Sequence, residues 1–168
     1  KTQNSKLLVY KKVGKLPESL SYKLSAISSL LAIGHTRWAT HGGVTIKNAH
    51  PHLDCTKTLA LVHNGIFENY EGIKTKLIKK GHKFESETDT EIFAHLIEHA
   101  SKQHAALEDA VAHALHAVIG AYGIAVISQK EPRKIVAARL GSPLVLGILQ
   151  DGGYIIAGDT NSYRAGGY

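Results

Sequence analysis

Sulfur-containing residues are scarce in this sequence, which has no methionine and a single cysteine, Cys55, in 168 residues. One cysteine excludes an internal disulfide framework and agrees with a reducing compartment, so we expect a cytoplasmic protein. No apolar run approaches the roughly 18 residues of a membrane-spanning helix, and no secretory signal follows Lys1, so we expect no membrane partner. Because methionine is absent, we expect the natural start to lie outside the sequence.

Acidic residues are also in short supply, with 14 Asp and Glu against 20 Lys and Arg and a net charge of +6. The lysines gather before Glu18 and at the end of an expected helix, where the helix dipole favours them. The sequence lacks the aromatic and basic alternation of single-strand binders, so we expect a solvated basic face and no nucleic-acid partner. With 43% hydrophobic and 20% charged residues, the composition is that of one globular domain with a packed core.

Hydrophobic periodicity predicts helices at residues 17–31, 67–80, 88–101 and 106–119. It predicts strands at residues 6–13, 30–34, 59–62, 121–128, 134–140, 143–149 and 153–157, with a long loop at residues 37–56. Helices gathered in the middle and a run of strands at the end favour an α+β fold with an antiparallel sheet over a doubly wound parallel one. We find no internal repeat and no second domain boundary.

The segment from Gly34 to Gly43 concentrates groups that bind a small zwitterion. Arg37 can take a carboxylate through two parallel hydrogen bonds. The indole of Trp38 is a large flat surface that can line a binding pocket, and Thr40 and His41 add a hydroxyl and an imidazole. The alternative for Arg37 is an ordinary surface salt bridge.

Two later segments supply complementary groups. Asn64 and Gly65 follow a short apolar run, so an amide donor and an unhindered backbone N–H emerge together, as an oxyanion hole requires. Asp89 lies where hydroxyl and carboxylate residues precede a helix, and it is placed to hold an ammonium group. The alternatives are a type I′ hairpin turn at Asn64 and Gly65, and a plain helix N-terminal carboxylate at Asp89.

Four motifs, GHTRWATHGG, AHPH, LVHNGIFENY and SETDTE, occur in this order. They resemble the glutaminase domains of the glutamine:fructose-6-phosphate amidotransferases, the glucosamine-6-phosphate synthase family within the class II, N-terminal nucleophile amidotransferases. The resemblance implies a four-layer α/β/β/α sandwich of two antiparallel sheets, here incomplete at both ends. Residues 1–168 would then form a single glutamine amidotransferase type 2 domain, present as a fragment.

The resemblance also implies the chemistry of the site. Family members hydrolyse L-glutamine to glutamate and ammonia, which passes to fructose 6-phosphate to make glucosamine 6-phosphate. Arg37 would bind the substrate α-carboxylate and Asp89 the α-ammonium, and Asn64 with the Gly65 N–H would form the oxyanion hole. Trp38, Thr40 and His41 would line the pocket. The implied partners are L-glutamine, sugar-isomerase domains of the parent protein and a second copy of that parent in a homodimer.

The sequence departs from the family at its start, because residue 1 is Lys1 and the Cys-Gly-Ile motif that opens the family, with the segment that follows it, has no counterpart here. Cys55 is internal, so it has no free α-amine and is not expected to be catalytic. The sugar-isomerase domains are also absent, and we expect this chain to be inactive alone. Two alternatives remain open, namely a non-catalytic glutamine-binding or interaction module and a sister class II amidotransferase.

Histidines raise the separate question of a metal site. His50 and His52 lie close in sequence to His35, His41 and His63. Pro51 separates the first pair in an irregular segment, whereas two ligands on one helix face need an i, i+4 spacing. Asp54 and Cys55 are the nearby residues that could complete a tetrahedral set of metal ligands with these histidines. We therefore expect no metal and no cofactor.

Overall fold

The computed structural model describes residues 6–15, 17, 19–20, 31–37, 42–150 and 152–159. Its larger sheet is antiparallel with strand order β1 (His52–Leu53), β2 (Leu59–Phe67), β3 (Gly120–Ser128), β4 (Ile135–Leu140). A second antiparallel sheet pairs β5 (Val145–Ile148) with β6 (Tyr154–Ala157). The helices are α2 (Tyr70–Lys79), α3 (Asp89–Ala100) and α4 (Leu107–Leu115). The predicted α+β fold with antiparallel sheets is confirmed.

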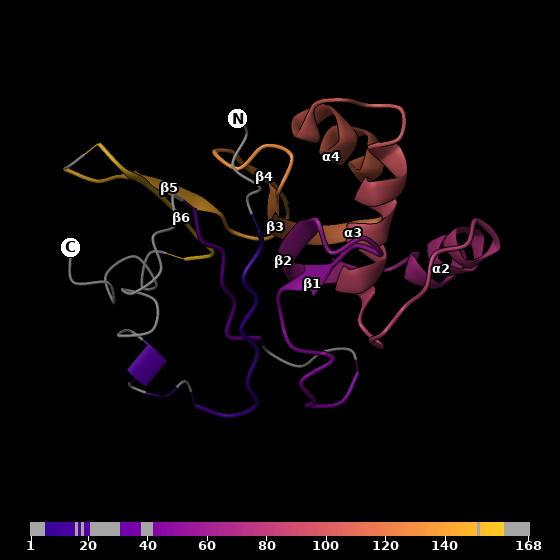
Figure 1. Ribbon diagram of the computed structural model, residues 1–168, viewed down its shortest axis with the longest axis horizontal. Coiled ribbons are helices and arrows are strands. Elements are labelled where there is room, and N and C mark those ends of the chain that lie inside the picture. The colour runs from indigo at the N-terminus through magenta and orange to yellow at the C-terminus, as the bar shows by residue number, and fades with distance from the viewer. Residues whose placement is uncertain are drawn as a thin grey trace.

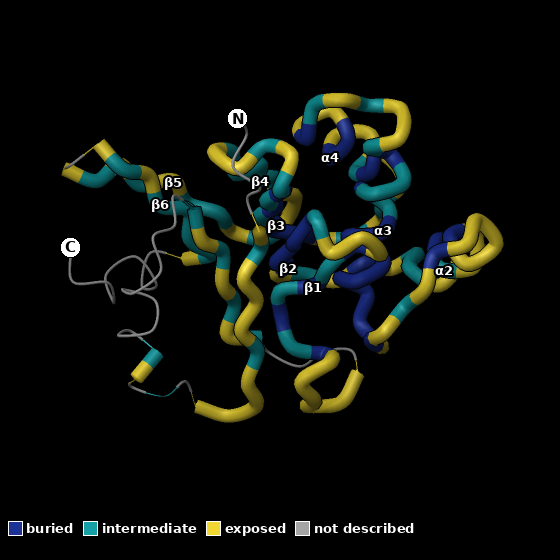
Figure 2. Tube along the Cα trace, in the orientation of Figure 1, coloured by how far each residue is buried: buried dark blue, intermediate teal, exposed yellow. Residues whose placement is uncertain are grey.

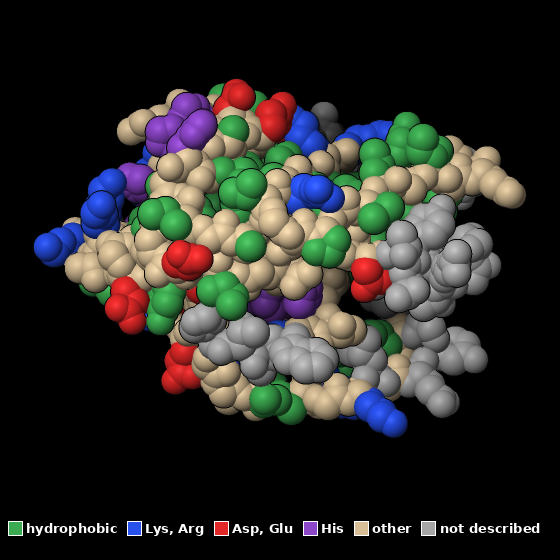
Figure 3. Space-filling model, turned by 180° about the vertical axis from the view of Figure 1, so that it is seen from behind, with side chains coloured by type: hydrophobic (Ala, Val, Ile, Leu, Met, Phe, Trp, Pro, Cys, Tyr) green, Lys and Arg blue, Asp and Glu red, His purple; other side chains and the backbone are tan. Residues whose placement is uncertain are grey.

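The layers are visible in Figure 1, where α3 and α4 cover one face of the larger sheet. The extended segments 6–15 and 31–37 run side by side across its other face, and β5 and β6 also lie away from the helices. None of the helices in the described ranges is both long enough and apolar enough to cross a membrane. Acidic and basic side chains are interspersed on the face drawn in Figure 3.

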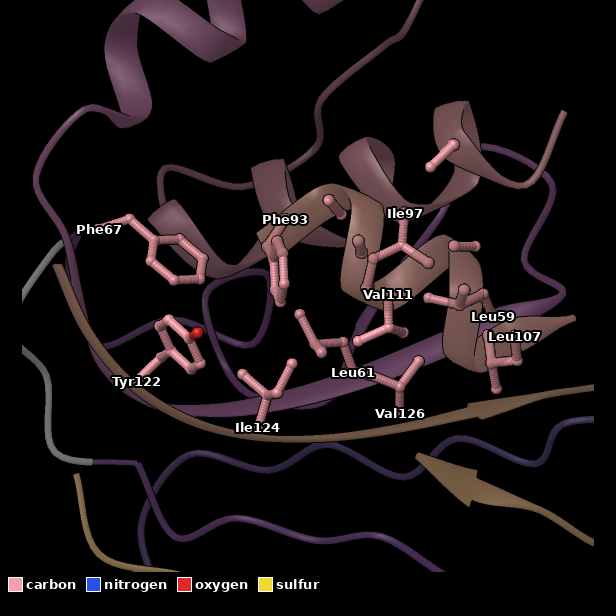
Figure 4. Close-up of a cluster of buried hydrophobic side chains, with 14 residues drawn as sticks. Leu59, Leu61, Phe67, Phe93, Ile97, Leu107, Val111, Tyr122, Ile124 and Val126 are labelled. Carbon is pink, nitrogen blue, oxygen red and sulfur yellow. The ribbon is translucent and has the colours of Figure 1, made fainter. Parts of the chain in front are cut away.

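The core lies between the larger sheet and the helices α3 and α4 (Figure 4). Alternate residues of β2 and β3 point into it, as the two-residue period of a strand requires. Its large side chains are Leu59, Leu61, Phe67, Phe93, Ile97, Leu107, Val111, Tyr122, Ile124 and Val126. Each such side chain contributes about 1.5 to 3 kcal/mol when fully buried. Most residues of β2 and α3 are buried, as Figure 2 shows. These two elements also position the candidate site.

The α3 helix is predicted almost to the residue, because its start is encoded locally. Thr88 has extended backbone angles, and its hydroxyl accepts the Glu91 N–H at 3.3 Å, which satisfies one of the free N–H groups of the first turn. The helices predicted at residues 67–80 and 106–119 are also present but shorter, at α2 and α4. The helix expected at residues 17–31 lies mostly outside the described residues.

Several strand predictions are wrong. Residues 6–13 and the described part of 30–34 are extended but belong to no strand, because a strand also needs ladder partners that an apolar pattern does not supply. Burial nevertheless alternates along residues 31–37, as in a half-buried extended segment. The loop expected at residues 37–56 contains the short β1, and β2 continues five residues beyond Val62. The strands predicted in the last third of the chain are confirmed as β3 to β6.

Candidate functional site

Asp89 is the first residue of α3, and its side chain is 4% exposed. Its Oδ2 accepts the backbone N–H of Phe67 at 3.0 Å, and its Oδ1 lies 3.4 Å from the hydroxyl of Thr90, which donates to it. A carboxylate at a helix N-terminus is also favoured by the helix dipole. Asp89 therefore links α3 to the end of β2 and places a negative charge there.

Asn64 and Gly65 lie inside β2, paired with Gly123 and Tyr122 of β3. The hairpin-turn alternative for these two residues is therefore wrong. Asn64 is exposed on the sheet face opposite α3, and a Cβ placed on Gly158 would lie 3.9 Å from the Asn64 Nδ2 atom. Gly65 has a φ of +146°, which L-residues rarely adopt, so the backbone of β2 turns out of regular strand geometry directly after Asn64.

Arg37 is half-buried, and its guanidinium folds back over its own loop. Its Nη1 donates to the Gly43 carbonyl at 3.1 Å and its Nη2 to the Gly42 carbonyl at 3.2 Å. Its backbone N–H donates to His35 Nδ1 at 2.8 Å. These bonds fix the direction of a planar, permanently charged group. Trp38, Thr40 and His41, which belong to the same predicted site, lie outside the described residues.

Histidines connect the Arg37 loop to β2 and α3. The rings of His35 and His50 stack with centroids 4.4 Å apart, and His50 Nδ1 accepts the backbone N–H of His63 at 3.3 Å. His63 Nδ1 lies 3.1 Å from the hydroxyl of Thr90, next to Asp89 in the first turn of α3. The four motifs are therefore joined through contacts of these side chains. Of the histidines that raised the question of a metal site, His35, His50, His52 and His63 pack or hydrogen-bond in this chain of contacts, and His41 lies outside the described residues.

Burial keeps this group of imidazoles neutral. It lowers the pKa of His50 to about 2, with further lowering from the nearby His35, His52, His63 and Arg37. Burial also lowers the pKa of His63 to about 4, although the Asp89 carboxylate acts in the opposite direction. The Arg37 guanidinium is a permanent positive charge near His35 and His50.

Asn48 is a positioning residue that the sequence analysis missed. It is 2% exposed, and its Nδ2 donates to the Gly43 carbonyl at 3.0 Å and to the Glu87 carboxylate at 3.1 Å. Its Oδ1 accepts the Glu87 N–H at 3.0 Å. Asn48 thus ties the loop that holds Arg37 to the segment before α3. Its place between two motifs was the available signal, but an isolated Asn in a loop is too common to single out.

Replacing Asn48 by alanine is expected to lower the free energy of unfolding by about 1 to 3 kcal/mol, because buried partners lose their hydrogen bonds. The measurement is urea unfolding followed by circular dichroism. The exposed Gln150, changed to alanine, is the matched control and is expected to stay within about 0.5 kcal/mol of the unchanged protein. Equal stabilities of the two variants would contradict the positioning role of Asn48.

Comparison with known families and structures agrees with this geometry. Residues 35–161 match the family described as "Glutamine amidotransferase domain". A similar solved structure is a glutamine phosphoribosylpyrophosphate amidotransferase from B. subtilis, with a TM-score of 0.66 and 29% identity, covering 79% of this chain and 28% of that one. A second, described as the allosteric regulatory enzyme of purine biosynthesis, has a TM-score of 0.66 and 31% identity and covers 79% of this chain and 29% of that one.

Curated relatives are more similar in sequence. A glutamine–fructose-6-phosphate aminotransferase (isomerizing) of Chlorobaculum tepidum is 52% identical over 135 residues, which cover 79% of this chain and 22% of the relative. The protein of the same name from Methanothermobacter thermautotrophicus is 45% identical over 159 residues, covering 94% of this chain and 27% of the relative. The chain therefore spans roughly a quarter of the length of these relatives.

Proposed function

Because the chain belongs to the glutamine amidotransferase domain family, we propose that it is the glutamine-hydrolysing part of a glutamine:fructose-6-phosphate aminotransferase. In this role it releases ammonia and glutamate from L-glutamine, and the ammonia is passed to fructose 6-phosphate. The observation that carries the proposal is the joining of the Arg37 loop, the Asn64–Gly65 segment and the start of α3 through His35, His50, His63 and Thr90.

The proposed substrate contacts rest on the charges of two side chains. Arg37 offers its guanidinium to the α-carboxylate, and Asp89 offers a buried carboxylate to the α-ammonium. The opposite charges of the substrate thus meet opposite charges on two different segments. Trp38, Thr40 and His41 line the pocket beside Arg37 in this proposal. A substrate lacking either charged group would lose one of the two anchors.

The proposed chemistry uses the Asn64 amide and the Gly65 N–H as an oxyanion hole. Attack on the side-chain amide carbon of glutamine turns the carbonyl oxygen into an oxyanion, which two fixed donors stabilise better than the ground-state carbonyl. Loss of one such donor typically costs about 2.7 to 4 kcal/mol of transition-state stabilisation. Gly65 supports this role because its φ of +146° turns the backbone beside the Asn64 side chain.

The nucleophile in this proposal is the N-terminal cysteine of the family, whose own α-amine takes the thiol proton. Cys55 does not meet that description, because its amine is part of a peptide bond. We accordingly assign residues 1–168 to one glutaminase unit that recognises glutamine and stabilises the oxyanion. Sugar-isomerase domains, a homodimeric parent and a cytoplasmic location complete the proposal.

The test is glutamate formation by the protein that carries this chain, with Asp89→Asn as the variant. Loss of a charged partner in a buried pair costs about 2 to 5 kcal/mol, so kcat/KM for glutamine is expected to fall by about 30-fold to 4,000-fold. The matched control is Asp109→Asn, which makes the same change in the first turn of α4 at an exposed position. Equal kcat/KM values for the two variants would refute the assignment of Asp89.

The acceptor is tested separately by supplying fructose 6-phosphate or phosphoribosyl pyrophosphate together with glutamine. Stimulation by the sugar phosphate alone is expected, since relatives that are 45% and 52% identical carry that name, whereas the phosphoribosyl enzyme is 29% identical. Stimulation by phosphoribosyl pyrophosphate would instead identify a sister amidotransferase. Binding of L-glutamate by calorimetry without any turnover would favour the non-catalytic module.

A further inference from the structure

A second cluster of polar side chains lies apart from the proposed glutamine site. It comprises Cys55 from the turn between β1 and β2, His82 from the segment after α2, and His95 and Glu98 from α3. One ligand atom from each residue lies within 4.8 Å of the other three. His82 and His95 are buried, Glu98 is half-buried and Cys55 is exposed. The cluster therefore sits at the edge of the fold rather than inside its core.

Five of the six distances within the cluster are close to the edges of a small tetrahedron, and the sixth, between the ligand atoms of Cys55 and Glu98, is at most 4.8 Å. Cys55 Sγ is 3.6 Å from His82 Nδ1 and 3.2 Å from His95 Nδ1, and the two Nδ1 atoms are 3.3 Å apart. Glu98 Oε2 is 3.3 Å from His82 Nδ1 and 3.4 Å from His95 Nδ1. With ordinary zinc–ligand bond lengths, a tetrahedral site has edges of about 3.4 Å between nitrogens and about 3.6 Å between sulfur and nitrogen.

Hydrogen bonds can satisfy only some of these contacts at one time. Each donor proton points at one acceptor, whereas here both Nδ1 atoms approach the same sulfur, the same carboxylate oxygen and each other. If both histidines carry their protons on Nδ1, two donors face one another at 3.3 Å. If both carry them on Nε2, both Nδ1 atoms are acceptors, and the Cys55 thiol can donate its proton to only one of them. With mixed tautomers one Nδ1 donates to the other, which satisfies that contact but not the remaining ones. A cation at the centre would be approached by all four ligand atoms at once.

The surroundings of the second ring nitrogen, Nε2, of His82 and His95 support metal coordination through Nδ1. Both Nε2 atoms are buried without a hydrogen-bond partner in the described part of the chain, but His95 Nε2 lies 3.6 Å from Glu91 Oε1. The Glu91 carboxylate is itself fixed by the Glu85 N–H at 2.8 Å and the Ser86 N–H at 2.7 Å. A carboxylate behind the second nitrogen of a metal-binding histidine is the usual outer contact of such sites.

The surroundings also permit entry of an ion. A surface pocket of about 560 Å³ is lined by Cys55 and His95 and opens beside the cluster. Asp54, the acidic neighbour of Cys55, is committed to its own turn, where its Oδ1 accepts the Thr58 and Leu59 N–H groups at 2.8 Å each. Glu98 is instead held near the cluster, since its Oε2 accepts the Cys55 N–H at 3.0 Å.

We propose that Cys55, His82, His95 and Glu98 form a tetrahedral zinc site that pins the β1–β2 turn and the segment after α2 onto α3. One thiolate, two imidazole nitrogens and one carboxylate are a donor set that Zn²⁺ accepts in closed, structural sites. This differs from the metal-free expectation drawn from the histidines around Pro51. The proposal does not depend on glutamine hydrolysis, although the helix it fixes also carries Asp89.

The experiment loads the protein that carries this chain with Co²⁺ after removal of metals by a chelator. A tetrahedral site with one thiolate is expected to give strong visible bands and a sulfur-to-cobalt charge-transfer band in the near ultraviolet. Competition with Zn²⁺ then yields the zinc affinity. Weak octahedral bands without the charge-transfer band in the wild-type protein would overturn the proposal, whatever the variants do.

Variants assign the ligands. Cys55→Ser is expected to abolish the charge-transfer band, and His95→Asn to weaken zinc binding by more than about a hundredfold. Glu91→Gln removes only the outer carboxylate, so it is expected to weaken zinc binding by about 10-fold to 100-fold while keeping the thiolate band. The control is His113→Asn. His113 lies outside the cluster, and the centroid of its ring is 4.8 Å from that of the His104 ring. A wild-type zinc affinity equal to that of Cys55→Ser and His95→Asn would also overturn the proposal.

Discussion

Replacing Gly65 by alanine is expected to lower the free energy of unfolding by about 3 to 5 kcal/mol and to abolish the proposed glutamine hydrolysis by the protein that carries this chain. A Cβ at this position would lie 2.0 Å from the Ala121 carbonyl oxygen and 2.9 Å from His63 Nε2. The φ of +146° adds backbone strain for any residue with a side chain. Strand β2 would therefore have to move away from β3 where the proposed oxyanion donors lie.

The sheet around Gly65 leaves β2 and β3 little room to move apart in response to a Cβ at this position. On the partner strand, Gly120 has a φ of +134°, and a Cβ there would lie 2.1 Å from the Ile66 carbonyl oxygen. Each strand thus places a carbonyl oxygen where a side chain on the other strand would need space. The Ala121 carbonyl of β3 faces Gly65, and the Ile66 carbonyl of β2 faces Gly120. His63, whose ring stacks on Phe67 with centroids 4.4 Å apart, blocks a further shift towards α3.

The measurement is chemical unfolding combined with a glutamate assay, with Gly72→Ala as the matched control. Gly72 lies in α2, and a Cβ there would meet no atom within 4 Å. The same substitution at Gly72 is expected to stabilise the protein by about 0.5 to 1 kcal/mol, because alanine favours a helix interior. If Gly65→Ala kept both the stability and the activity of the unchanged protein, neither the close approach nor the oxyanion role would stand.

The elements that could be predicted from the sequence are those with local signals. The α3 helix has a threonine cap and an amphipathic stripe within its own residues, and its predicted bounds at 88–101 differ from Asp89–Ala100 by one residue at each end. The antiparallel strands of the last third carry apolar runs separated by turns, and they are confirmed as well. The α+β class followed from the order of these elements.

The end of β2 could not be predicted from such signals, because its polar residues are stabilised by distant segments. His63 appeared to close the strand after Val62, yet its Nδ1 contacts the Thr90 hydroxyl at 3.1 Å and its backbone N–H donates to His50. Buried polar groups of this kind depend on partners that tertiary structure brings together. The same reason explains why Asn64 and Gly65 were compatible with a turn in the sequence but belong to a strand.

The candidate site and the cysteine cluster also contain residues of two kinds, those that a local sequence pattern marks and those that only the fold brings together. Arg37, Asn64, Gly65 and Asp89 were found through motifs, whereas Asn48 carries no distinctive local pattern. In the cluster, only the i, i+3 spacing of His95 and Glu98 is local, and Cys55 is 40 residues away from His95. The histidines near Pro51 suggested a metal site because they are close in sequence. In the fold, the rings of His50 and His52 pack against other rings, and His82 and His95 are the histidines that lie beside Cys55.

Acidification is expected to unfold the protein between about pH 6 and pH 4, because three buried histidines must take up protons on unfolding. Burial lowers the pKa of His50 to about 2, that of His52 to about 3 and that of His63 to about 4. Nearby positive charge from Lys11 contributes at His52. All three rings are therefore neutral in the folded protein over a range where they are charged in the unfolded chain.

The sign follows from proton counting. Below pH 6.5, the ordinary pKa of histidine, the unfolded state binds more protons than the folded state, so stability falls as the pH falls. Each ring contributes at most about 1.4 kcal/mol per pH unit until the pH reaches its folded pKa, and three rings together contribute about 4 kcal/mol per pH unit. A total stability of about 5 to 15 kcal/mol is exhausted within a few pH units at this slope.

The measurement is urea unfolding at pH 7.5, 6.5, 5.5 and 4.5 with a chelator present throughout, so that metal release does not contribute. His50→Gln is expected to reduce the slope of stability against pH by about 1.4 kcal/mol per unit, even where the substitution lowers stability at every pH. His116→Gln, at an exposed position, is the matched control and should leave the slope unchanged. If the two variants share one slope, His50 is protonated in the folded state, and the neutral histidine contacts that join the Arg37 loop to β2 would have to be abandoned.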